Sequence, residues 1–350
     1  MIKKSLKEIS WNVSEKEYRE DPALSYSTLS RFEREGFGNL DKLFESIESP
    51  SLLLGSITDC LLTDGEQAFS DAYYISDIPS LKPSVEPVVK KAYEMFHNSY
   101  TNINDILDSD LMPLIAEYKY QPNWKNETRC KSIKQEGAQY YQTMFMARGK
   151  TVVAQDMYNK AFACVRALKD SPLTGRFFSE NDPFSDVEKL YQLKFKGNMN
   201  GVDYRCMADV IVVDHKNKIV YPCDLKTSSH MEYDFPKSFL QFRYDLQARL
   251  YWNLIRQNMR DDEYFREFRL DNYRFIVVNT IDEPNPLIWE FEQTQETGTL
   301  NLGGKELRTP WAIGKELSYY LESRPKVPLG IKEGKTNSIE EWFRNNGQQS

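Results

Sequence analysis

The sequence predicts an α/β fold in which a mixed β-sheet is flanked by helices and by an N-terminal helical layer. Runs rich in β-branched and aromatic residues at 203–213, 218–227 and 273–280 are typical of strands. Between the second and third runs, residues 236–257 repeat apolar side chains at helical spacing. Most of the chain before residue 170 carries helical patterns, which indicates a helical layer on the N-terminal side of the sheet.

Helical periodicity and turn signals organise the first half of the chain. Residues 1–20 are polar and are expected to be flexible apart from a short docking segment around Ile9–Val13, and Pro79–Pro87 marks a break between helices. Helices are predicted at Ser25–Glu35, Asn39–Ser46, Leu53–Leu62, Pro87–Tyr100, Ile133–Arg148 and Thr151–Lys169.

A hairpin forms the centre of the predicted sheet. The polar turn Asp-His-Lys-Asn-Lys at 214–218 joins its two strands, and Pro222 cannot donate a ladder hydrogen bond. We therefore expect the second strand to bulge or bend at Pro222. The remaining elements are strands at 187–196, 273–280 and 286–293, and helices at 236–257 and 310–323.

The predicted organisation is a single domain over residues 21–325. It comprises a helical part at 21–170, a catalytic sheet core at 185–295 and a closing helix at 310–323. A polar tail, residues 326–350, follows it, with a short ordered segment expected at Ile339–Phe343.

Two carboxylates and a lysine meet on the predicted hairpin. The period of two residues puts Asp224 and Lys226 on the same face of their strand. If the hairpin pairs around residues 215–217, Asp209 falls opposite Asp224, so the two acids can share one divalent cation. With a lysine beside attacking water or phosphate, this set is typical of metal-dependent phosphodiester hydrolysis. Taken alone, an Asp and a Lys two residues apart are also typical of a solvated charged face.

The helix after the hairpin carries a second candidate set. Tyr244, Gln247 and Tyr251 form one stripe along it, where an amide and two phenols can face a phosphate. A Gln and Tyr pair on a helix is also typical of surface and core-rim positions, so both interpretations stay open.

The combined order of these motifs resembles the PD-(D/E)xK nuclease superfamily, in its RecB-like branch, and is most similar to phage and prophage RecE-type exonucleases. The resemblance spans roughly residues 20–295 and implies a restriction-endonuclease-like sheet. It is carried by Ala208–Asp209, Asp224-Leu225-Lys226-Thr227, Tyr244-Asp245-Leu246-Gln247-Ala248-Arg249-Leu250-Tyr251, Leu24-Ser25-Tyr26-Ser27-Thr28-Leu29 and Leu53–Leu62.

The resemblance implies roles for individual residues. Asp209 and Asp224 would bind magnesium, with manganese as an alternative, and Lys226 would be the catalytic lysine. Gln247 and Tyr251 would contact DNA or order the site. Tyr244 and Arg243, beside them, are further expected DNA contacts.

Two more acids are expected at the metal on the strength of the resemblance. Glu188 opens the strand before the hairpin, where relatives often carry a glutamate. Asp59 follows Gly55-Ser56 where the family often shows histidine, and its carboxylate is a suitable oxygen ligand for magnesium. The alternative is that Asp59 is a helix-surface aspartate.

Charge is unevenly distributed along a chain whose net charge is −7. Residues 119–150 hold seven Lys or Arg against two acids, and residues 226–260 hold six against three. Lys131 and Lys134 in the first stretch are candidate phosphate contacts. Each stretch is equally consistent with an ordinary solvated face.

Composition excludes several classes of protein. No apolar run approaches the roughly 20 residues of a membrane span, and the N-terminus lacks a secretory signal, so a cytoplasmic protein that binds no membrane is expected. The five cysteines are scattered, which argues against a zinc site or an iron–sulfur cluster.

These observations favour a magnesium-dependent deoxyribonuclease. The resemblance implies a duplex-end exonuclease in phage-type recombination, with linear duplex DNA, a single-strand annealing protein and further copies of the chain in a ring as partners. The alternatives are a catalytically inactive nucleic-acid-binding module of the same fold and a structural adaptor.

Overall fold

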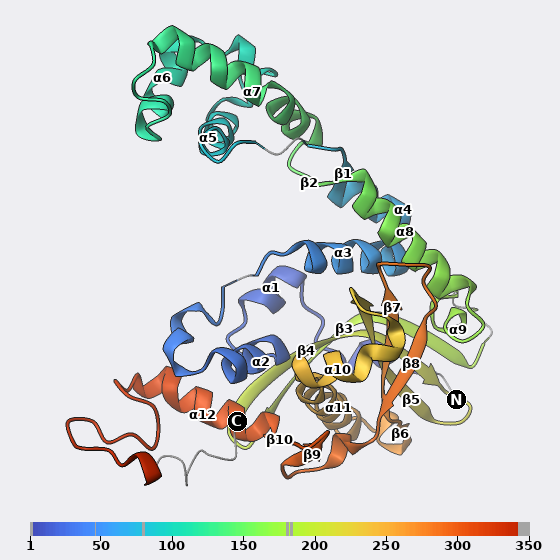
Figure 1. Cartoon of the computed structure of the whole chain (residues 1–350). Coiled ribbons are helices and arrows are strands. Elements are labelled where there is room, and N and C mark those ends of the chain that lie inside the picture. The colour runs from blue at the N-terminus through green and yellow to red at the C-terminus, as the bar shows by residue number, and fades with distance from the viewer. Residues whose placement is uncertain (1–2, 46, 79–80, 180–181, 183–184, 342–350) are drawn as a thin grey trace. The chain divides into compact units, whose positions relative to one another are not determined.

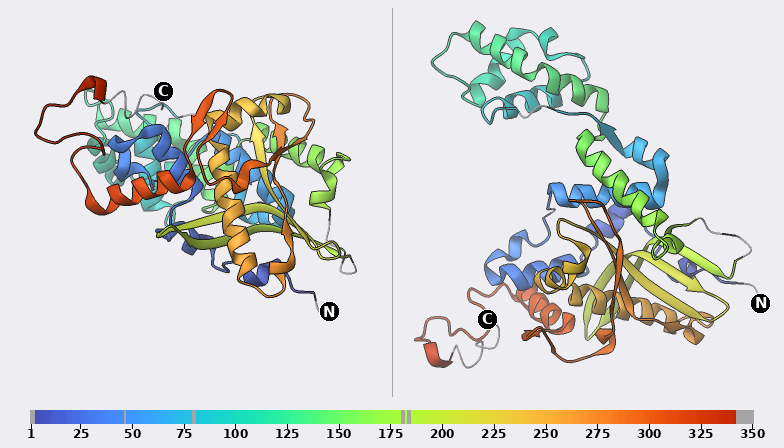
Figure 2. Two further views of the ribbon diagram at one scale, coloured as in Figure 1. Left: turned by 90° about the horizontal axis from the view of Figure 1, so that it is seen from below. Right: turned by 45° about the vertical axis from the view of Figure 1, so that its right-hand side comes forward.

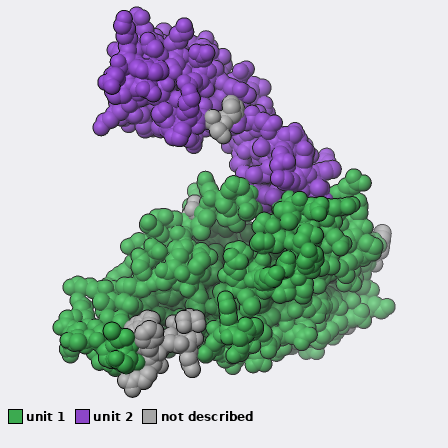
Figure 3. All heavy atoms as spheres, in the orientation of Figure 1, with its two compact units in different colours: residues 1–52, 166–350 green, residues 53–165 purple. Residues whose placement is uncertain are grey.

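The computed structural model describes residues 3–45, 47–78, 81–179, 182 and 185–341 (Figure 1). These residues form two compact units (Figure 3). Residues 1–52 and 166–350 make up the first, here called the sheet unit, and residues 53–165 make up the second, the helical unit. The predicted single domain over 21–325 spans both units and stays a prediction. The boundaries fall within α3 (Pro50–Asp59) and α8 (Gln155–Asp170).

The predicted α/β class is confirmed, because a mixed sheet flanked by helices is the centre of the sheet unit. The strands run in the order β3-β4-β5-β7-β8, and β6 also pairs with β5. Only the contacts of β5 with β6 and β7 are parallel; the other pairs are antiparallel. The strands are β3 (Val187–Met199), β4 (Val202–Asp214), β5 (Ile219–Ser228), β6 (Arg269–Leu270), β7 (Tyr273–Asn279) and β8 (Leu287–Phe291).

The central hairpin pairs in the predicted register. Val210 lies opposite Cys223, and the ladder runs without interruption past Pro222 to the turn. The predicted bulge at Pro222 is therefore wrong. On its other edge, β5 pairs with β6 at Ile219 and Val220 and with β7 from Cys223 onward. Pro222 lies between the residues of β5 that pair with β6 and those that pair with β7. On that edge it has no partner strand within the described residues, so its missing N–H costs no inter-strand hydrogen bond there.

The helices of the sheet unit cover its sheet, and α11 is the longest of those that lie wholly within it. Figure 2 shows α11, in gold to orange, packed against the sheet and crossing its long strands. Leu246, Leu250 and Leu254 of α11 are fully buried, as their spacing predicts. The helical elements are η1 (Leu6–Ile9), α1 (Glu15–Glu20), α2 (Tyr26–Glu35), η2 (Phe37–Lys42), α9 (Gly175–Phe178), η5 (Glu232–Asp234), α10 (Phe235–Gln241), α11 (Tyr244–Arg260), η6 (Phe265–Glu267), η7 (Gln293–Gln295) and α12 (Pro310–Ser323). A two-stranded hairpin, β9 (Leu300–Leu302) and β10 (Lys305–Leu307), precedes α12.

The helix predicted at 236–257 is two helices. Arg243 takes a left-handed conformation, with φ of 56°, between α10 and α11. Such a residue interrupts the helical hydrogen-bond ladder, so α11 starts afresh at Tyr244. This restart fixes which side chains of α11 point at the sheet.

The described N-terminal segment packs against the sheet, and its contacts include the docking segment expected around Ile9–Val13, although the rest of residues 1–20 was expected to be flexible. Leu6 is fully buried, and the backbone N–H of Trp11 donates to the carbonyl of Lys194 at 2.7 Å. Lys196 forms an ion pair with Asp21 at 2.6 Å. These contacts dock the segment on β3.

The helical unit has a hydrophobic core of its own. Val85, Val89, Ile133 and Tyr141 are among its fully buried residues. Gly137 allows two of its helices to approach closely, because a Cβ there would lie 2.6 Å from a methyl group of Val89. Its elements are η3 (Cys60–Asp64), α4 (Gly65–Ala72), β1 (Tyr73–Ile75), α5 (Glu86–Phe96), η4 (Ile103–Asp105), α6 (Asp108–Glu117), α7 (Asn126–Ala147) and β2 (Thr151–Val153).

Within the described residues, no helix has both the length and the hydrophobicity that a membrane span requires. Residues 342–350 of the predicted tail, which include part of the segment expected at Ile339–Phe343, lie outside the described residues, as do residues 1–2.

Candidate active site

Asp209 and Asp224 lie side by side on the central hairpin. The register that pairs Val210 with Cys223 brings Asp209 next to Asp224 as the two strands continue. Asp209 Oδ2 accepts a hydrogen bond of 3.0 Å from the backbone N–H of Leu225, the residue after Asp224. The structure therefore brings the two predicted carboxylates together.

Lys226 completes the acidic pair from the same face of β5. Its Nζ lies 2.5 Å from Asp224 Oδ2, and Asp224 is fully buried. The ammonium group also sits over the ring of Tyr244, 4.6 Å from its centroid. Burial lowers the pKa of Lys226, but the charge of Asp224 outweighs that effect and the pKa is raised above its usual value. The lysine is therefore held as a cation.

Gln247 points at the other oxygen of the buried carboxylate. Its Nε2 donates a short hydrogen bond to Asp224 Oδ1, and the residue is 4% exposed. This contact fixes the orientation of Asp224. Of the two roles that the sequence left open for Gln247, the geometry favours ordering the site.

Tyrosines enclose this group of charges. Tyr251 and Tyr273 pack edge to face, with ring centroids 6.3 Å apart, and burial raises the pKa of both phenols. Tyr244 stacks on Phe235 at 5.7 Å. Burial likewise raises the pKa of Tyr26, whose hydroxyl donates to the carbonyl of Phe242 at 2.7 Å. These phenols stay neutral, and they shield Asp224 from bulk water, whereas Asp209 is partly exposed.

Arg243, expected to bind DNA, is committed to partners within the protein. It forms ion pairs with Glu33 at 2.9 Å and with the fully buried Asp245 at 2.8 Å. It also donates to the carbonyl of Arg308 at 2.9 Å. Its charge is balanced here, and the contacts hold α2 against the start of α11.

Glu188 does not join the two aspartates. It pairs with Val213 of β4, four residues from Asp209, which corresponds to about 13 Å along a strand. Its carboxylate accepts a hydrogen bond of 2.5 Å from Ser5 and lies 3.5 Å from His215 Nε2. Glu188 therefore anchors the N-terminal segment and the hairpin turn, and its placement removes it from the expected metal site.

Three predicted residues belong to the helical unit. Asp59 is the last residue of α3, directly before the π-helical turn η3. Lys131 is exposed on α7, while Lys134 forms an ion pair with Asp108 at 2.7 Å. Their assigned roles at DNA and metal stay predictions.

The chemistry of the two carboxylates suits a hard cation. Within the described residues, the buried Asp224 Oδ2 contacts the ammonium of Lys226 at 2.5 Å and accepts no other hydrogen bond. Those residues gather no group of three or more acidic, histidine or cysteine side chains around a metal position. Magnesium does not require three or more protein ligands, because one or two carboxylates together with water and substrate phosphate commonly bind it.

Sequence reasoning missed the supporting contacts of this site. The N–H of Leu225 is a backbone donor, which no residue pattern reveals. Tyr26 lies in the Leu24–Leu29 segment that carries the family resemblance, so the resemblance of that segment could have indicated that Tyr26 lies near the site. The ion pairs of Arg243 join residues far apart in the chain, and nothing local marks them.

Comparisons with known proteins leave the chain without a family assignment. No family model matches it, and no curated protein is similar to it in sequence. A similar solved structure is a crystal structure from Eubacterium rectale named "Putative exonuclease". It is 13% identical, the match covers 95% of this chain and 98% of that chain, and the TM-score is 0.47.

Proposed function

We propose that this protein is a metal-dependent deoxyribonuclease that hydrolyses phosphodiester bonds at Asp209, Asp224 and Lys226. The observation that carries the proposal is the convergence of two carboxylates and a protonated lysine, with Gln247 fixing the buried acid. A restriction-endonuclease-like arrangement of the sheet is part of the proposal.

Each side chain has a distinct task in this proposal. Asp209 and Asp224 would hold magnesium, which when bound polarises the phosphate and lowers the pKa of water. The backbone N–H of Leu225 and the amide of Gln247 keep the two carboxylates in place. Lys226 places a compact positive charge beside the negative charge that develops on the phosphate.

A cleavage assay tests the proposal. End-labelled linear, nicked and circular duplexes are incubated with the protein and magnesium, manganese or chelator. We expect cleavage with either metal and none in chelator, and loss of turnover in Asp209→Asn and Asp224→Asn. Glu188→Gln is the matched control, since it also removes one negative charge but lies away from the site. Robust cleavage in excess chelator would contradict the metal mechanism.

A narrower proposal is digestion of linear duplex DNA from an end, in phage-type recombination beside a single-strand annealing protein. The resemblance to RecE-type exonucleases supports it, and it extends to a homo-oligomeric ring. Tyr319 is 44% exposed and available for such an interface, whereas Trp252 and Tyr320 are buried in the core. Light scattering tests assembly; a monomer that cuts closed circles would contradict the ring exonuclease.

A second candidate is a nucleic-acid-binding module without chemistry. The observation that favours it is the ion pair between Lys226 and Asp224, which already balances the charge that a cation would meet. DNA binding with no cleavage under any metal condition would establish this alternative. Cleavage that depends on Asp209 would exclude it.

A further inference from the structure

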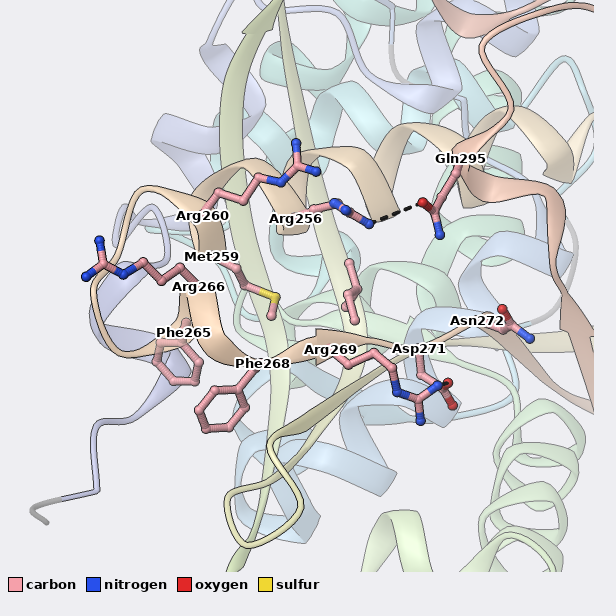
Figure 4. Close-up of a pocket in the computed structure, with 11 residues that line it drawn as sticks. Arg256, Met259, Arg260, Phe265, Arg266, Phe268, Arg269, Asp271, Asn272 and Gln295 are labelled. Atoms are coloured by element: carbon pink, nitrogen blue, oxygen red, sulfur yellow. Dashed lines mark hydrogen bonds and ion pairs between the residues drawn. The ribbon is translucent and has the colours of Figure 1, made fainter.

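A second group of cationic side chains surrounds a hollow at the opposite end of α11 from Gln247. The hollow has a volume of about 300 Å³ and lies between the last turns of α11, η6 and β6 (Figure 4). Arg256 and Arg260 come from α11, Arg266 from η6 and Arg269 from β6. Gln247 and Arg256 are nine residues apart, which corresponds to about 14 Å along a helix.

Most cationic residues of the basic stretch 226–260 are ion-paired or buried within the protein. Lys226, Lys237 and Arg243 form ion pairs with aspartates. Arg249 is fully buried: its Nη2 donates to the carbonyl of Gly298 at 2.8 Å, while its Nε and Nη1 have no hydrogen-bond partner among the described residues. Of this stretch, Arg256 and Arg260 remain.

Three of the four arginines of the hollow form no ion pair within the residues that the structure describes. They are Arg256, Arg260 and Arg266. Asp271 is the one acid in the described lining, and it already pairs at 2.7 Å with both Arg269 and Arg274. Burial lowers the pKa of Arg256, and the positive charge of Arg260 lowers it further. The lining therefore holds four arginines against one aspartate, while Asp261, Asp262, Glu263 and Glu267 lie in the adjoining segment outside the lining.

Packing holds one of these guanidinium groups in place. Arg256 lies over the ring of Trp252, 4.8 Å from its centroid. Its Nη1 donates to Gln295 Oε1 at 3.3 Å, the contact dashed in Figure 4. Its other N–H groups face no acceptor that the described residues supply. Buried Met259 and Phe265 add apolar side chains to the lining. A guanidinium group held in place beside apolar side chains is suited to a phosphate that carries an organic group.

The helix dipole explains only part of this arrangement. A cation near a helix C-terminus is favoured, and Arg260 is in the last turn of α11. Arg266 and Arg269 lie outside α11, so the dipole gives no reason for them. The three guanidinium groups without an ion pair also exceed the charge of a single phosphate, whereas successive phosphates of a strand can match them.

We propose that this arginine hollow is a second phosphate-binding site, which takes backbone phosphates of the nucleic acid strand beyond the point of cleavage. The proposal rests on the proposed function for the identity of the strand. Its arginines bind and orient the strand and take no part in the chemistry.

The test uses the full-length protein in chelator, so that no cleavage occurs, and a fluorescent linear duplex. Affinity is measured between 50 and 200 mM salt for the protein and for Arg256→Gln/Arg260→Gln. If each arginine neutralises one phosphate, the slope of log affinity against log salt falls by about 1.8. Lys305→Gln/Lys315→Gln is the control: it removes the same charge from two exposed lysines elsewhere in the sheet unit and should leave the slope unchanged.

A second variant guards against misfolding. Arg260→Gln/Arg266→Gln changes two exposed side chains and should lower the slope as well. An unchanged slope in both arginine variants would overturn the proposal. A second outcome would also overturn the proposal: inorganic phosphate or a mononucleotide binds the hollow, while the salt dependence of DNA affinity is the same in the arginine variants and the unmodified protein. That result would identify a site for a free phosphate. Cleavage in magnesium is measured separately and tests the proposed function. If the arginine variants lower the salt dependence of DNA affinity but the protein cleaves no DNA, the result supports the phosphate-binding site and not the nuclease function.

Discussion

At the scale of single residues, Lys226 serves stability as well as chemistry. Its ammonium balances a carboxylate that has no exposure to water, and a buried charge without a partner is costly. The neighbouring amide of Gln247 orients Asp224 but carries no charge to replace the lysine.

We therefore predict that Lys226→Ala destabilises the protein by about 3 kcal/mol, because it leaves Asp224 buried and unpaired. Thermal unfolding of the variant measures the loss. Asp224→Asn/Lys226→Gln removes both charges together and should unfold closer to the unmodified protein. If both variants lose the same free energy of unfolding, charge balance does not explain the destabilisation.

The site could be predicted in part because its acids and lysine follow strand periodicity. Asp224 and Lys226 are two residues apart, and a polar turn fixed the register that put Asp209 beside them. The partners of Arg243 could not be predicted, because they depend on how α2 and α11 pack. Glu188 was misplaced because its assignment came from the resemblance and not from the register.

At the scale of elements, α12 meets the sheet through a residue with no side chain. A Cβ on Gly314 would lie 2.1 Å from the hydroxyl oxygen of Tyr204 and 2.8 Å from its Cζ. Tyr204 is fully buried on β4, so its ring has little room to move.

Gly314→Ala should therefore destabilise the protein by about 1–3 kcal/mol, despite the better helix propensity of alanine. Denaturant unfolding measures the change. Tyr204→Phe removes the nearest atom, a hydroxyl that is buried without a hydrogen-bond partner in the described residues, and should recover part of the loss. A stabilised Gly314→Ala variant would show that the ring moves freely.

The elements themselves were predictable to different degrees. The strands of the hairpin and the closing helix follow clear periodicity and were found. The division of 236–257 was not, because Arg243 is an ordinary helix former and nothing in its sequence neighbourhood marks the left-handed conformation that it adopts. Helix α6 was missed because Pro113 lies inside it, and proline usually argues against a helix.

At the scale of the whole molecule, the site and the helical unit are separable. Asp209, Asp224, Lys226 and Gln247 all belong to the sheet unit, and residues 53–165 bury a core of their own. The sequence suggested one domain because the family pattern assigned Asp59 to the metal.

We predict that residues 53–165, expressed alone, fold cooperatively into a helical protein. Circular dichroism during heating measures this, and a featureless transition would contradict it. A chain in which a short Gly/Ser linker replaces 53–165 should keep magnesium binding, measured by calorimetry. Lost binding in that folded chain would favour Asp59 as a ligand, and Asp59→Asn in the full chain is the matched control.

The insertion of residues 53–165 into the sheet unit has a consequence for biosynthesis. Leu24 bridges to Tyr204, a residue that leaves the ribosome on the order of ten seconds or more after it. The N-terminal segment cannot complete its contacts before β4 has been synthesised, whereas the helical unit has its complete core before that point. We expect protease to cut residues 3–52 of ribosome-bound chains arrested near residue 200 and to spare 53–165. The first part of the polypeptide to be made would then be among the last to fold, and its exposed apolar residues would need protection during that interval.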